Sequence, residues 1–148
     1  MRRFFLLLLA SLMVLGGSPV SARGGERIWS GLVMATNHHR PIAAAPRPMH
    51  RLHRTLQRTF GYNQFEVIGQ SHRMLRSGQE DWLAASKHFS LHVDTRGETR
   101  NGYRVHLKLF QDRQVLLETD ATLSRSGPLV IRGPQVGAGQ LLLVLVAQ

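Results

Sequence analysis

The sequence predicts an α+β domain in which one amphipathic helix packs on a mainly antiparallel β-sheet of about six strands, after a cleaved signal peptide. Three observations lead to this fold class: a leader-like N-terminus, one stretch with helical periodicity, and a C-terminal half in which apolar and polar residues alternate. The length of 148 residues suits a single domain. The hydrophobic content of 43% disfavours disorder over the whole chain.

The first 22 residues have the order of features found in a secretory signal peptide. Arg2 and Arg3 precede an apolar run from Phe4 to Leu15, and a small-residue pattern ending at Ala22 follows. The run has 12 residues, fewer than the ~20 that span a bilayer as a helix. We therefore expect cleavage after Ala22, a single domain over residues 23–148 without a transmembrane segment, and a periplasmic or secreted location.

The processed chain begins with a predicted strand, an extended linker and one helix. Ile28 to Thr36 is rich in apolar residues and ends at a turn-like NHHRP, which predicts the strand. Residues 37–48 contain three prolines and predict the linker. From Met49 to Phe60 the apolar residues recur on one side of a helix, with basic residues opposite. Its apolar side holds Met49, Leu52, Leu56 and Phe60, and its basic side holds Arg47, Arg51, Arg54 and Arg58.

The remainder predicts strands. Tyr62 to Gln70 has a strand pattern, and Arg73 to Leu83 is a less regular stretch broken by Ser77-Gly78. Two short apolar segments, Leu129 to Arg132 and Gln140 to Ala147, complete the set, and the second is so apolar that it should be covered on both faces. Between Leu83 and Leu129 lie three clearly alternating strands. Their expected inward residues are Phe89, Leu91 and Val93; Tyr103, Val105, Leu107 and Leu109; and Val115, Leu117, Thr119, Ala121 and Leu123.

Charge pairing predicts how these three strands are aligned, because opposite charges on facing positions are favourable. In the second hairpin this alignment needs either a five-residue connection from Gln111 to Val115 or a bulge. The expected cross-strand pairs are Asp94 with Arg104 and His92 with His106 in the first hairpin, and Lys108 with Glu118 and His106 with Asp120 in the second.

The charge balance narrows the class of partner. The chain has 19 Lys+Arg against 9 Asp+Glu, a net charge of +10, and no cysteine. Without cysteine there is no disulfide, thiolate metal site or thiol catalysis. A basic exported protein meets lipid phosphates, acidic glycans and acidic protein faces rather than nucleic acid.

The arginine side of the helix is the most specific feature of the sequence. Like charges three and four residues apart cost a few tenths of a kcal/mol per pair, which favours a functional explanation. A basic helix of this kind docks on an anionic surface or partner. The function predicted from the sequence is thus a non-enzymatic adaptor on an envelope protein or anionic envelope surface, without a cofactor, and the alternative is an ordinary solvated face. The expected contact residues are Arg47, Arg51, Arg54 and Arg58.

Two other function classes stay open. A periplasmic copper or zinc carrier would use His38, His39, His50 and His53, although no third ligand is evident for either His50 with His53 or His92 with His106. Hydrogen-bonded or exposed histidines are the simpler interpretation, and Asp120 is a ready partner for His106. A hydrolase of envelope polymers would need a cleft with paired polar groups, and the sequence has no G-x-S-x-G, H-E-x-x-H, P-loop or G-x-G-x-x-G motif.

Overall fold

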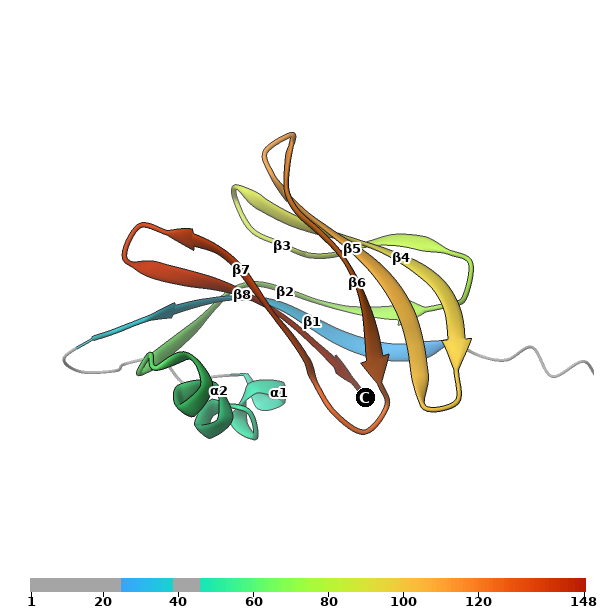
Figure 1. Ribbon diagram of the computed structural model, residues 1–148, viewed down its shortest axis with the longest axis horizontal. Helices are drawn as coiled ribbons and strands as arrows, with labels where there is room; N and C mark the ends of the chain where they lie inside the picture. The colour runs from blue at the N-terminus through green and yellow to red at the C-terminus, as the bar shows by residue number, and fades with distance from the viewer. Residues whose placement is uncertain (1–24, 39–45) are drawn as a thin grey trace, which may run out of the picture.

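The computed structural model describes residues 25–38 and 46–148. In these ranges the chain forms eight strands in two four-stranded antiparallel sheets, with two short helices on the outside of one sheet (Figure 1). The first sheet has the order β2-β1-β8-β7 and the second the order β3-β4-β5-β6. The predicted signal peptide, residues 1–22, lies outside the described residues, as does the middle of the predicted linker 37–48.

The elements follow one another along the chain with short connections, apart from the segment that precedes the helices. They are β1 (Glu26–Thr36), α1 (Arg47–His50), α2 (His53–Phe60), β2 (Gln64–Leu75), β3 (Glu80–Ala85), β4 (Phe89–Thr99), β5 (Gly102–Gln111), β6 (Gln114–Ser124), β7 (Leu129–Val136) and β8 (Gly139–Ala147).

The predicted strand count of about six in one sheet is wrong: the described chain has eight strands in two sheets. The irregular stretch after Gln70 divides into the end of β2 and the separate strand β3, with a turn at Gly78, whose φ of 78° favours glycine. Alternation along a strand shows which face is buried, but it does not show which strands share a sheet. The mainly antiparallel character is confirmed.

The main core lies between the two sheets. It joins apolar residues of β1 and β8 to the inward faces of β4 and β5, and nearly all of the expected inward residues of the second sheet belong to it. Val115 and Thr119 are the exceptions. Thr119 is only partly buried, and a bulge between Leu109 and Phe110 places Val115 opposite Phe110 and leaves it 44% exposed.

Strand β8 is covered on both faces, as its sequence predicts. It lies between β1 and β7, and Leu141 to Leu145 have no exposed surface. Leu141, Leu143 and Leu145 pack in the core between the sheets, whereas Leu142 and Val144 contact a second core beneath the helices.

The predicted helix is interrupted, but its sidedness is confirmed. The Leu52 N–H donates to the carbonyl of Met49, three residues back, so the chain tightens between α1 and α2 instead of continuing one helix. Met49, Leu52 and Leu56 are buried against the first sheet, and each such burial contributes about 1.5–3 kcal/mol. Gly61 ends α2 in the left-handed conformation, with its N–H bonded to the Gln57 carbonyl at 3.0 Å.

One predicted register is wrong and the other is confirmed. In the first hairpin His92 faces Lys108 and Asp94 faces His106, two residues away from the prediction, because a bulge between Thr95 and Gly97 and a tight turn at Arg100-Asn101 set the alignment. In the second hairpin the bulge replaces the five-residue connection, and the turn is Asp112-Arg113. Its confirmed pairs are Lys108 with Glu118 and His106 with Asp120.

Candidate functional site

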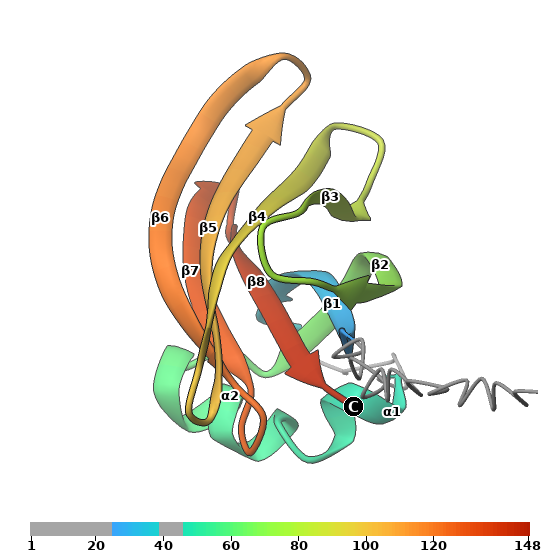
Figure 2. The same ribbon diagram turned by 90° about the vertical axis from the view of Figure 1, so that its right-hand side faces the viewer.

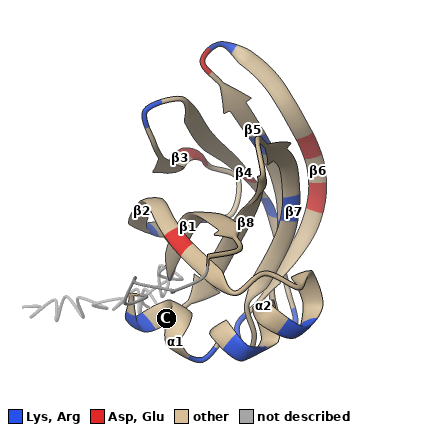
Figure 3. Cartoon of the chain, turned by 90° about the vertical axis from the view of Figure 1, so that its left-hand side faces the viewer, with Lys and Arg blue, Asp and Glu red and all other residues tan. Residues whose placement is uncertain are grey.

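The two helices present a face of arginine side chains to solvent. The buried side chains of α1 and α2 pack on the first sheet, so the arginines on the opposite side of these helices point away from it. None of the four arginines on this side of the helices makes a hydrogen bond or ion pair with another described side chain. Figure 3 shows the basic residues along the helices at one end of the molecule. The members of this arginine face, all exposed, are Arg47, Arg51, Arg54 and Arg58.

The charges of the two signs are separated along the chain. Between Glu26 and Glu66 there is no acidic residue, so the helices carry no acid that would neutralise their arginines. Seven of the nine acidic residues lie from Glu80 onward, where the second sheet is formed. The electrostatic potential at the helix end is therefore positive, which favours the approach of anions.

Part of the arginine face borders a hollow. Arg47 and Arg51 line a groove of about 610 Å³ between α1, β2 and the end of β8. The C-terminal end of β8 lies beside α1 in Figure 2. A smaller hollow of about 270 Å³ adjoins it, and the two share Pro48, Arg51, Val146 and Ala147. Arg51 thus lies where the two hollows meet.

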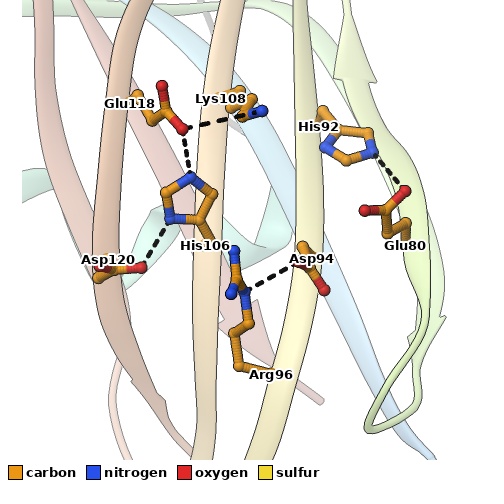
Figure 4. Close-up of polar contacts among 8 residues, drawn as sticks. All are labelled: Glu80, His92, Asp94, Arg96, His106, Lys108, Glu118 and Asp120. Atoms are coloured by element: carbon orange, nitrogen blue, oxygen red, sulfur yellow. Dashed lines mark hydrogen bonds and ion pairs between the residues drawn. The ribbon is translucent and has the colours of Figure 1, made fainter.

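The outer face of the second sheet carries a different polar cluster. His106 lies between two carboxylates of β6, with Nδ1 at 2.6 Å from Asp120 and Nε2 at 2.7 Å from Glu118 (Figure 4). The hydrogen bonds to Asp120 and then to Glu118 raise the pKa of His106 above its ordinary value of 6.5. The hydrogen bond from His106 lowers the pKa of Glu118, and Lys108 is 3.7 Å from the same carboxylate.

The sequence predicted only half of this cluster. Asp120 was the expected partner of His106, and the confirmed register places it there. Glu118 was missed as a second partner, although its position two residues from Asp120 on the same strand face was the available signal.

A pH prediction follows from the His106 cluster. Both ring nitrogens donate only in the charged imidazolium, and the pKa is raised in the folded state, so the stabilisation is fully present below about pH 6.5 and is lost as the pH rises through the folded pKa. We expect the urea midpoint of the wild type to fall more steeply than that of His106→Gln between about pH 6 and pH 9. The other histidines are present in both proteins, so equal slopes would contradict the prediction.

An aromatic group lies next to this cluster. Trp82 on β3 is 50% exposed, and its ring is 5.0 Å from that of His92 and 5.4 Å from that of Phe110. His92 is also 3.8 Å from the carboxylate of Glu80. These contacts keep the exposed indole in a defined position on the sheet.

The histidines of the metal hypothesis are placed as follows. The backbone N–H of His38 donates to Asn63 Oδ1, His50 is exposed on α1, and the ring of His53 contacts Phe65 edge-on at 5.5 Å. His39 lies outside the described residues. Among the residues that the structure describes, no group of three His, Cys, Asp or Glu side chains is arranged to hold a metal ion. The register separates the other suggested pair, since His92 faces Lys108 and not His106.

No family model, curated protein or solved structure matches this chain. Neither helix in the described ranges is long and apolar enough to cross a membrane. The support for a role of the arginine face therefore comes from its own geometry and chemistry.

Proposed function

We propose that this protein is an exported, non-enzymatic adaptor that docks on an anionic partner of the cell envelope through its arginine face. The observation that carries the proposal is the exposure of four guanidinium groups that have no partner among the described side chains. Each would pair with a carboxylate or phosphate of the partner, and such charge-assisted hydrogen bonds are about twice as strong as neutral ones. The proposed export is supported by the signal-peptide pattern of residues 1–22.

Elsewhere in the described chain, several cations already form ion pairs with Asp or Glu. Arg125 binds Glu98 at 2.8 Å and is 3.3 Å from Glu26, and Arg96 is 2.9 Å from Asp94. These side chains would have to break an existing contact before they reached a partner. The arginine face has no such cost, and it gathers four cations on two adjacent helices, which favours it as the docking surface.

The proposal predicts that Arg47, Arg51, Arg54 and Arg58, all changed to Ser, lower partner recovery by at least about tenfold, equivalent to ~1.4 kcal/mol. The variant should fold normally, because the four side chains are exposed and repel one another. The measurement is cross-linked co-purification from the protein's own cell envelope, with captured material identified by mass spectrometry. Binding of the wild type should weaken as salt is added.

A matched control removes four positive charges that lie outside the helices. It changes to Ser four exposed cations at the hairpin turns of β2 to β6: Arg76, Lys87, Arg100 and Arg113. Its net charge equals that of the test variant, so equal losses in both would mean that overall charge, and not the arginine face, causes the capture. Full recovery with the test variant would refute the docking function.

A further inference from the structure

The hollow of about 610 Å³ beside α1 has a lining that suits an anion. Among the residues that the structure describes, its charged side chains are the two arginines Arg47 and Arg51, and no Asp or Glu lines it. The adjoining hollow adds Arg125, whose charge is already engaged by Glu26 and Glu98. Pro48, Val146 and Ala147 supply apolar surface next to the cationic groups. The volume lies in the range of ligand sites, about 300–1,000 Å³.

The neutral polar groups of the hollow also present donors. The indole Nε1–H of Trp29 donates to Gln70 Oε1 at 2.8 Å, and because indole only donates, this bond fixes which end of the amide is oxygen. The Gln70 NH₂ group is therefore left for a ligand. His72 Nδ1 is 2.9 Å from Gln148 Oε1, an oxygen that can only accept, so with this amide orientation the ring nitrogen donates and the Gln148 NH₂ group takes no part in the bond.

We propose that this hollow is a carboxylate-binding site that receives an acidic peptide segment of the partner. Arg47 and Arg51 form charge-assisted hydrogen bonds with its carboxylates, and the amide groups of Gln70 and Gln148 donate to the remaining oxygen atoms. Pro48, Val146 and Ala147 contact the aliphatic carbons beside the carboxylates. This site deepens the proposed docking function and rests on it.

A peptide fits the surroundings better than a lipid headgroup does. A helix that binds a membrane surface buries its apolar side among the lipids. Here Met49, Leu52 and Leu56 are buried against the first sheet instead. Among the described residues, the large exposed hydrophobic side chains are Met74, Trp82 and Val115, which lie on β2, β3 and β6 and not on the helices.

The test uses the two tryptophans of the chain as reporters. Trp29 lines the hollow and its indole N–H is bonded to Gln70, which would contact the ligand, whereas Trp82 lies on the second sheet. We expect a hexaglutamate peptide, titrated into the exported protein, to shift the Trp29 indole N–H resonance in two-dimensional NMR and to leave that of Trp82 in place. A Trp82→Phe variant assigns the two signals. A Trp29 resonance that does not move at millimolar peptide would overturn the proposal.

Two double variants with the same net charge separate this inference from the docking function. Arg47→Ser with Arg51→Ser should weaken the peptide response and partner recovery by at least about tenfold, because it removes both guanidinium groups of the hollow. Arg54→Ser with Arg58→Ser, which lie on α2 away from the hollow, should change the peptide response by less than about threefold and should lower partner recovery less than the first double variant does.

The alternative results are distinct. If both double variants weaken partner recovery equally, the arginine face binds by diffuse charge, and the site in the hollow is refuted while docking stands. If neither weakens it, both proposals fail. If phosphatidylglycerol vesicles shift the Trp29 resonance and hexaglutamate does not, the occupant is a phosphate group and the peptide assignment is wrong.

Discussion

Leu143→Ala is expected to lower the free energy of unfolding by about 2–5 kcal/mol. Leu143 has no exposed surface and lies on β8, between Leu32 of β1 and Ile131 of β7. Its side chain packs in the core between the sheets, where neighbours held in three strands have little freedom to move into the vacated space. The cost is therefore both the lost burial and the cavity that remains.

Urea denaturation of the wild type and Leu143→Ala measures this loss. Val115→Ala is the control, because Val115 is also an aliphatic strand residue but is 44% exposed. Its stability should change by less than about 0.5 kcal/mol. A loss below ~1 kcal/mol for Leu143→Ala would show that the core between the sheets relaxes around the deletion.

Ser30→Ala is expected to cost about 1–3 kcal/mol, a large effect for the removal of one hydroxyl group. The Ser30 hydroxyl on β1 accepts the Ala84 N–H of β3 at 3.0 Å, and it is 2.9 Å from the Ser71 hydroxyl. Ser30 and Ala84 have no exposed surface. Alanine would leave the Ala84 N–H buried without an acceptor, and it would remove a hydrogen bond that joins the two sheets.

Hydrogen exchange adds a local measurement to the urea midpoint of this variant. The Ala84 amide should exchange faster in Ser30→Ala than in the wild type. Ser124→Ala is the control, because the Ser124 hydroxyl bonds to that of Ser126 at an exposed turn. Unchanged protection of Ala84 would contradict the role given to the Ser30 hydroxyl.

Sequence periodicity predicted the strands in which one face is buried and the other is exposed to solvent. Leu107 and Leu109 alternate with His106 and Lys108 along β5, and the structure confirms both faces. The same reasoning failed at Val115, because a bulge shifts the residues on its turn side by one position relative to the rest of β6 and leaves no mark in the hydrophobic pattern. It also failed to count the sheets, since a buried face looks the same whatever covers it.

The candidate site shows a similar division. The exposure of Arg54 and Arg58 was predictable because the helix period alone places them opposite Leu56. The hollow was not predictable, because Gln70 and Gln148 lie far apart in the sequence and meet only through the pairing of β1 with β2 and β8. Nothing in their local sequence separates them from ordinary surface glutamines.

The place of β8 beside β1 sets the timing of assembly. The first strand of the described chain pairs with residues 140–147, so the first sheet lacks a central strand until the end of the sequence has been synthesised. Contacts between such distant segments form slowly, and the incomplete sheet has little cooperative stability. Under the proposed export, a chain built in this way would stay loosely folded during passage through a secretion channel and would close into its final form only after it.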